Sequence, residues 1–150
     1  MALKRQQIID AIVTRLKLIN GAGGYYLNLN SRVYDNRVPE YADNEIPAVN
    51  ITDGDEESNQ ELLAGSVNYW YRDLNIGITL IVNGTLAAAD VRKGIADIQL
   101  AISTDLKWSA LAIDTIWTGT TIDRNQEEKK IMSATVNITV RYSTTEWLES

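Results

Sequence analysis

The chain has 150 residues, a net charge of −6 and a hydrophobic share of 45%, which together predict a single folded domain over residues 1–150. Cysteine and histidine are both absent, so disulfides, thiolate or imidazole metal ligands and catalytic triads built on either residue are excluded. The acidic balance also argues against a protein that binds nucleic acid through a basic face.

The first predicted element is an amphipathic helix over residues 4–19. Apolar residues recur there at helical spacing, and most charged residues fall on the other side. The sequence NGAGG at 20–24 ends this helix, and Gly21 suits the left-handed position after the last turn. The sequence SRVYDN at 31–36 is compatible with a short strand.

Residues 46–52, with the sequence IPAVNIT, predict a better strand, with Pro47 at its start or at a sheet edge. The acidic sequence DGDEESN follows directly at 53–59. Blocks of like charge are usually solvated or face a partner, so we expect a loop here and no metal site.

A metal site and a catalytic carboxylate pair are two alternatives to a loop in this acidic segment. A calcium loop of the EF-hand type needs glycine at its sixth position and glutamate at its twelfth, whereas Gly54 is second and Ala64 is twelfth here. A looser Mg²⁺ or Ca²⁺ site remains as an alternative. So does a carboxylate pair at Asp53 and Glu57 of the kind that glycosidases use.

The second half of the chain begins with a long predicted strand at 67–82, where apolar side chains at even positions alternate with polar ones. The sequence NGT at 83–85 predicts a turn, with Thr85 as the N-cap of a second helix. Apolar residues continue this helix at helical spacing from Val91 to Ile102. Gly94 inside it predicts close packing against a neighbouring element.

Residues 111–118 and 131–142 predict two further strands that suit a hairpin, with a charged loop at 123–130 between them. The order of helices and strands predicts an α+β fold. We expect a two-layer sandwich, in which two main helices pack on one face of a mostly antiparallel sheet.

The second face of the long strands is polar but almost uncharged. Exposed sheet faces usually carry more Lys and Glu, so a Thr- and Asn-rich face favours contact with a neighbouring protein through hydrogen bonds. The alternative is that these residues only reflect the β-propensity of threonine. The residues concerned are Asn75, Thr79, Ser133, Thr135, Asn137 and Thr139.

The order of these segments resembles the tail terminator proteins of long-tailed bacteriophages, the family typified by the lambda tail terminator. The resemblance spans nearly the whole chain, and its most telling part is RVYDNRVP, followed by IPAVNIT and the acidic stretch. The other segments that carry it are IIDAIVTRLKLI, LNIGITLIVNG, AAADVRKGIADIQLAI and SATVNITVRYST.

The resemblance implies a structural virion protein that caps the tail tube as a hexameric ring. Such a ring ends tube polymerisation and provides the surface that joins the tail to the head connector. The resemblance implies neither catalysis nor a cofactor. Alternatives are another head–tail joining or neck protein, such as a head- or tail-completion factor, and a small enzyme that uses Asp or Glu.

The partners implied by the resemblance are further copies of the chain, the tail tube protein, the head–tail connector or neck protein and, in contractile tails, the sheath. DNA would pass through the lumen without specific binding. The location would be the head-proximal end of the tail, after assembly in the host cytoplasm. The sequence predicts no membrane span and no signal peptide.

We expect contacts to neighbours on the polar strand face and in the charged segments 35–45, 53–61 and 119–130. The candidate interface residues are Arg32, Arg37, Tyr41, Asp53, Asp55, Glu56, Glu57, Arg124, Glu127, Glu128, Thr135, Asn137 and Thr139.

Overall fold

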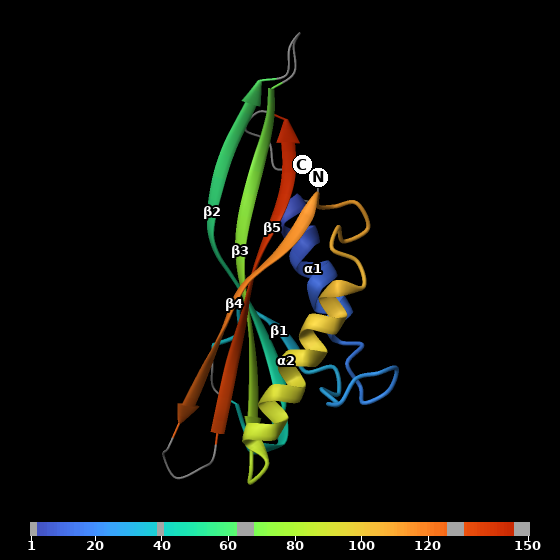
Figure 1. The fold of residues 1–150 in the computed structure, drawn as a ribbon, viewed down its shortest axis with the longest axis vertical. Coiled ribbons are helices and arrows are strands. Elements are labelled where there is room, and N and C mark those ends of the chain that lie inside the picture. The colour runs from blue at the N-terminus through green and yellow to red at the C-terminus, as the bar shows by residue number, and fades with distance from the viewer. Residues whose placement is uncertain (1–2, 39–40, 63–67, 126–130, 146–150) are drawn as a thin grey trace.

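In the residues that it describes, a computed structural model of the chain, shown in Figure 1, contains one five-stranded sheet and two α-helices. It describes residues 3–38, 41–62, 68–125 and 131–145. In chain order the elements are α1 (Lys4–Leu16), β1 (Val33–Asp35), the 3-10 helix η1 (Asp43–Glu45), β2 (Ala48–Leu62), β3 (Asn68–Asn83), α2 (Ala87–Ser103), β4 (Asp114–Asn125) and β5 (Ile131–Thr145).

The strands lie in the order β1-β2-β3-β5-β4. Only β1 and β2 run parallel, and the other three pairs are antiparallel. This arrangement confirms the α+β class and the mostly antiparallel sheet. The predicted hairpin near the C-terminus is also present, because β4 pairs with β5.

Both helices lie on the same side of the sheet in Figure 1, and we call this side the helix side. The even-numbered residues at 74–82 of β3 and 134–142 of β5 point toward it and form the core with the apolar stripes of the helices. Each fully buried Leu, Ile or Val stabilises the fold by about 1.5–3 kcal/mol relative to an exposed one. The buried residues of the two strands include Leu74, Ile76, Ile78, Leu80, Val82, Ala134, Val136, Ile138, Val140 and Tyr142.

Gly94 of α2 packs directly on β3, as its place in the helix predicts. A Cβ at this position would lie 2.0 Å from Cδ2 of Leu80 and 3.0 Å from Cδ1 of Leu27. The absent side chain therefore allows the helix to approach the sheet closely.

Asp97 lies on the buried side of α2. Its carboxylate accepts hydrogen bonds from the backbone N–H groups of Tyr26 (2.9 Å) and Leu27 (2.8 Å). A buried carboxylate is costly unless it is hydrogen-bonded. Asp97 therefore fastens the loop after α1 to α2.

The strands are much longer than the helices. At about 3.3 Å per residue, the 16 residues of β3 extend for roughly 50 Å, whereas the 17 residues of α2 extend for roughly 25 Å. Figure 1 shows the result: the β2–β3 hairpin projects beyond α1 at one end of the molecule, and β4 and β5 diverge sideways from α2 at the other.

Two helix boundaries differ from the predicted ones. α1 ends at Leu16 and not at residue 19, because the backbone N–H groups of Leu18 and Ile19 bond three residues back, to Arg15 and Leu16. Ile19 is still buried in the core. The prediction of Thr85 as the cap of α2 is wrong, since Leu86 occupies the N-cap position without a side-chain hydrogen bond.

The acidic segment DGDEESN is not a loop, contrary to the prediction, because β2 continues through it to Leu62. The pairing with β3 resumes after a bulge between Asp53 and Glu56. The long alternating strand β3 pairs with this segment along one side, and the bulge absorbs the extra residue. β4 likewise extends through the predicted charged loop as far as Asn125, and residues 126–130 lie outside the described part.

Candidate functional site

The face of the sheet opposite the helices, which we call the open face, carries a ladder of polar side chains. The hydroxyls of Thr79 and Thr135 lie 3.0 Å apart, and the hydroxyl of Thr139 donates to Oδ1 of Asn75 at 2.7 Å. Each of these pairs joins residues directly opposite each other on β3 and β5. The described hydrogen bonds thus run across the face, and the residues remain partly exposed.

An ion pair continues this ladder toward the end of the sheet that carries the β2–β3 hairpin. Arg141 of β5 donates from Nε and Nη2 to the two carboxylate oxygens of Asp73, at 2.7 and 2.9 Å. The hydrogen bond from Arg141 lowers the pKa of the Asp73 carboxyl, against a smaller opposing effect of burial. Asp73 is thus a fixed anion on the open face.

The centre of the open face is a shallow hollow of about 530 Å³. Gly77 lies at its floor, where a Cβ would come within 3.3 Å of Thr135 Cγ2 and 3.7 Å of Asn137 Oδ1. All lining residues are uncharged, and they include Thr52, Asn75 and Thr118. The hollow offers hydroxyl and amide groups to a neighbour, with no ionic charge in its lining.

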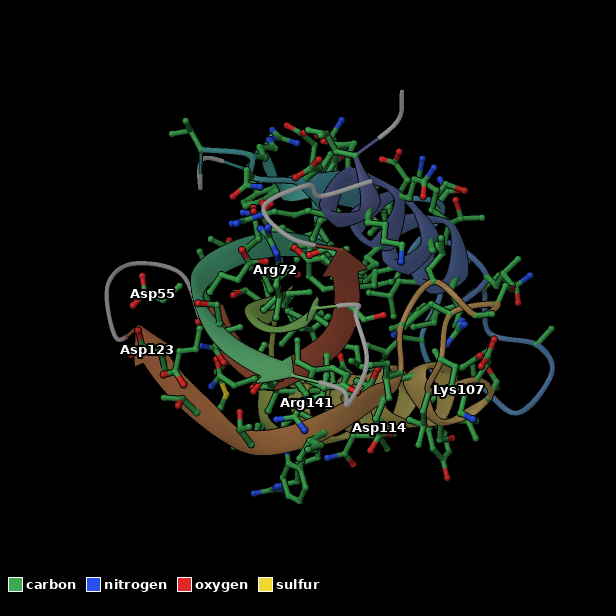
Figure 2. The ribbon with its side chains drawn as sticks, turned by 90° about the horizontal axis from the view of Figure 1, so that it is seen from above. Asp55, Arg72, Lys107, Asp114, Asp123 and Arg141 are labelled. Atoms are coloured by element: carbon green, nitrogen blue, oxygen red, sulfur yellow. The ribbon has the colours of Figure 1, made fainter. Side chains whose placement is uncertain are left out.

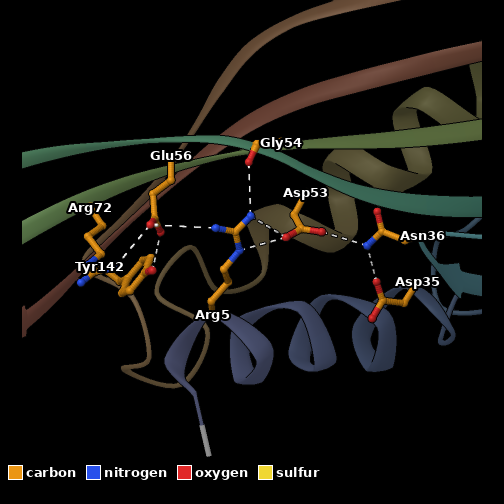
Figure 3. Close-up of polar contacts among 8 residues, drawn as sticks. All are labelled: Arg5, Asp35, Asn36, Asp53, Gly54, Glu56, Arg72 and Tyr142. Atoms are coloured by element: carbon orange, nitrogen blue, oxygen red, sulfur yellow. Dashed lines mark hydrogen bonds and ion pairs between the residues drawn. The ribbon is translucent and has the colours of Figure 1, made fainter. Parts of the chain in front are cut away.

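Asp53 and Glu56, which we predicted to face a partner, point instead toward α1 (Figure 3). Arg5 of α1 donates to Oδ2 of Asp53 at 2.9 Å from Nε and 2.7 Å from Nη2. Glu56 lies 3.4 Å from the Arg72 guanidinium and 3.9 Å from that of Arg5. The hydroxyl of the buried Tyr142 also donates to Glu56.

These contacts keep Asp53 ionised. Burial alone would raise the pKa of the Asp53 carboxyl, but hydrogen bonds from Asn36 and Arg5, together with the Arg5 charge, hold it below its ordinary value of 3.8. A carboxyl paired in this way is an anchor between α1 and β2, and it is poorly suited to donate a proton near neutral pH.

The other two carboxylates of the segment, Asp55 and Glu57, are exposed. Figure 2 shows Asp55 at the rim of the sheet, away from the helices. The bulge therefore divides the acidic cluster into an inward pair and an outward pair. Within the described part of the chain, no three acidic side chains gather closely enough to hold a metal ion.

Arg37 and Tyr41 belong to a small cluster beside β1. The Arg37 guanidinium lies 2.7 Å from Glu45 and 4.5 Å from the ring centres of both Tyr34 and Tyr41. The hydrogen bond from Arg37 lowers the pKa of Glu45. The side chain of Asn50 exchanges two hydrogen bonds with the Arg37 backbone, at 2.9 and 2.8 Å, and so ties the cluster to β2.

The remaining predicted residues are scattered. Arg32 donates from Nε to the backbone carbonyl of Pro47 at 2.8 Å, which ties the start of β1 to that of β2. Arg124 lies on β4, but its side chain is outside the described part, as are Glu127 and Glu128. Among the predicted residues, Thr135, Asn137 and Thr139 share the open face, whereas the Arg37–Tyr41 cluster, the Asp53–Glu56 pair and the Asp55–Glu57 pair form separate groups.

An exposed apolar strip on β4 was missed by the sequence analysis. Ile116, Trp117 and Ile122 are 53%, 58% and 44% exposed. Trp117 also borders a groove of about 340 Å³ between β4 and the end of α2, whose apolar lining includes Ile102 and Leu106. The signal available in the sequence was the uncharged stretch TIWTGTTI at 115–122.

Neither helix of the described chain has both the length and the apolar character needed to span a membrane.

Comparison with protein-family profiles gives no match, and no curated protein matches the chain. Among solved structures, the chain is similar to a chain of the virion of a native gene transfer agent (GTA) particle. The identity is 14% and the TM-score 0.40, with 95% of this chain and 92% of the other covered. A TM-score below 0.5 does not establish a shared fold or role.

Proposed function

We propose that this chain is a structural virion protein whose copies form a hexameric ring at the end of a bacteriophage tail tube. The ring stops tube polymerisation and presents the surface to which the head connector joins. The proposal starts from the sequence resemblance to tail terminator proteins. The observation that carries it is the open face of the sheet, whose centre is polar and uncharged and which is largely uncovered by described parts of the chain.

The chemistry of the open face supports a role in contacts between proteins. Ladder residues such as Thr135 and Asn75 already hold partners within the face, so their side chains are pre-ordered before a neighbour arrives. A preorganised surface loses less conformational freedom on binding. In this proposal the subunit is a two-layer sandwich, and its helical layer faces away from that contact.

The charge of the chain also fits a ring around DNA. In this proposal the lumen shares the acidic character of the chain, whose net charge is −6, and so repels the phosphate backbone and lets DNA pass without binding. The partners in this proposal are other copies of the chain, the tail tube protein, the connector or neck protein and, in a contractile tail, the sheath.

The acidic residues support a role without catalysis. Asp53 and Glu56 are held by Arg5, Arg72 and Tyr142, so neither side chain is available as a nucleophile or a base. In this proposal the protein acts by shape, needs no cofactor and is located in the virion.

The test is a tube-growth assay with purified tail tube protein. Adding this protein should halt elongation, so that electron micrographs show shorter tubes with a ring at one end. Native mass spectrometry should show six copies in that ring. Tubes that grow to the same length with and without the protein would overturn the proposal, and binding only to DNA-filled heads would support a neck protein in its place.

A further inference from the structure

The sheet has two edges that no described segment covers. β4 is the last strand on one side. On the other side, β1 pairs only with Val49–Ile51 of β2, so the outer edge of β2 beyond Asp53 has no strand beside it in the described chain. An open edge presents unpaired backbone N–H and C=O groups, to which another strand can bind.

The β4 edge has a bulge between Trp117 and Gly119, but it lacks two other features that normally prevent such pairing. Residues 115–122 include neither a charge nor a proline, and natural edge strands commonly use one or the other to block association. Apolar side chains stand on both faces: Ile116 lies opposite Thr139 on the open face, whereas Ile122 lies opposite the core residue Ala134. This combination is typical of a strand that accepts a partner strand.

The β2 edge is acidic, in contrast to the uncharged β4 edge. Asp55 and Glu57 are exposed on it, and Glu61 follows in the same strand. Two β2 edges brought together would place these carboxylates against their own copies, and like charges opposite each other are destabilising. A β2 edge can therefore add to an uncharged edge, but not to another β2 edge.

We propose that the β4 edge of one copy pairs with the β2 edge of the next copy, along residues 55–62 of β2, so that the sheet continues from subunit to subunit. This inference rests on the proposed function, because a ring requires a contact that repeats head to tail. Pairing β4 with β4 would join two copies symmetrically and leave no β4 edge for a third.

Charges of both signs surround the β4 edge. Lys107 is exposed in the loop just before this strand, and Figure 2 shows Lys107 and Asp114 on the same flank of the molecule. Lys107 favours the carboxylates of an incoming β2, whereas the exposed carboxylates of Asp114 and Asp123 oppose them, so the proposed pairing uses the uncharged residues 115–122 between these two aspartates. Strand addition also brings alternate side chains to the groove beside Trp117, where apolar surface becomes buried.

The absence of cysteine makes cross-linking a direct test. Glu57→Cys and Thr121→Cys are both exposed and on the open face, because their strand partners are Asp73 and Thr135. We expect a short bis-maleimide cross-linker to join the two variants when they are mixed in the assembled ring, and to join neither variant to itself. Ala96→Cys, on the exposed side of α2, is the matched control and should give no product with either variant.

Three outcomes would overturn this inference. A ring of native mass without the mixed product would exclude the β4–β2 contact and leave the proposed function standing. A product from Thr121→Cys alone would show that β4 pairs with its own copy. Failure of the unmodified protein to form a ring in the tube-growth assay would remove the proposed function together with the inference.

An independent variant adds a charge to the edge without touching the core. Ile116→Lys should abolish ring formation while its circular dichroism and melting temperature stay close to those of the unmodified chain, since Ile116 is exposed. Unchanged ring formation in Ile116→Lys would count against the β4 edge as the contact.

Discussion

The two faces of β3 differ in chemistry even at adjacent residues, both of which pair with β5. Ile78 points to the helix side and is buried opposite Val136, whereas Thr79 points to the open face and bonds Thr135. One face gains its free energy by removing apolar surface from water. The other gains little from its hydrogen bonds, because water can replace them. The helix side therefore maintains the fold, and the open face is free to serve contacts.

The largest expected effect is the loss of core packing at Ile78. Ile78→Ala should lower the free energy of unfolding by about 2–5 kcal/mol, because it removes buried atoms and leaves a cavity. Thr79→Ala is the matched control on the other face and should cost only about 0.5–1.5 kcal/mol. Denaturant titration measures both values. Equal losses at the two positions would contradict the division between the faces.

The next effect concerns how closely α2 lies on the helix side. Gly94→Ala should destabilise the protein by about 1 kcal/mol, since overpacking against Leu80 outweighs the gain in helix propensity. The double variant with Leu80→Val should lose less than the sum of the single variants, because the shorter side chain gives the new methyl group room. Additive losses in thermal melts would contradict this contact.

An effect of similar size, dependent on pH, distinguishes the two aspartate–arginine pairs. Asp53 has a lowered pKa, so its contribution to stability is present above its ordinary value of 3.8 and is lost as pH falls through the lowered pKa. Asp53→Asn should cost about 1 kcal/mol at pH 7 and flatten the loss of stability on acidification. Asp73→Asn is the counterpart on the open face.

Unfolding curves at a series of pH values between neutrality and about pH 2 test this prediction, because the pKa values of both aspartates are lowered in the folded protein. The pKa of Asp73 is lowered too, so its substitution should change the acid limb in the same direction. Because Asp53 joins α1 to β2 and Asp73 joins neighbouring strands, only Asp53→Asn should increase exchange of the α1 amides. Equal exchange in both variants would contradict the anchoring role of Asp53.

The smallest effect on stability should accompany a large effect on assembly. Asn137→Lys and Thr135→Lys each add a charge to the open face and should change the free energy of unfolding by about 0.5–1 kcal/mol or less. Both should block ring formation, because an unpaired charge would be buried at the contact. Ala96→Lys on the exposed side of α2 is the control and should assemble normally. Rings of normal mass from Asn137→Lys would show that the open face is not a contact needed for ring formation.

Elements with a strong local period were predictable from the sequence. The alternation in β3 and β5 and the helical spacing in α1 and α2 place these elements within a few residues of their observed bounds. Gly94 was informative for the same reason, since a glycine inside a helix is costly unless a neighbour requires it.

The features that could not be predicted depend on residues far away in the chain. The charge of residues 53–59 favours a loop, but β3 supplies a ladder that makes them a strand. Arg5 and Asp53 lie 48 positions apart, so neither residue signals the other. The exposure of Trp117 follows from the position of β4 at the end of the strand order, which no local pattern encodes.

The unequal lengths of strands and helices also determine how a mechanical load would travel through the subunit. A force applied at the projecting β2–β3 hairpin enters the globule through β3, which is bonded to β2 on one side and β5 on the other. A pull along β3 therefore loads two rows of backbone hydrogen bonds in shear. These bonds must break together, whereas bonds that are peeled apart break one by one. The long central strand would act as a stiff rod that transmits tension between the two ends of the subunit while the helices carry little of it.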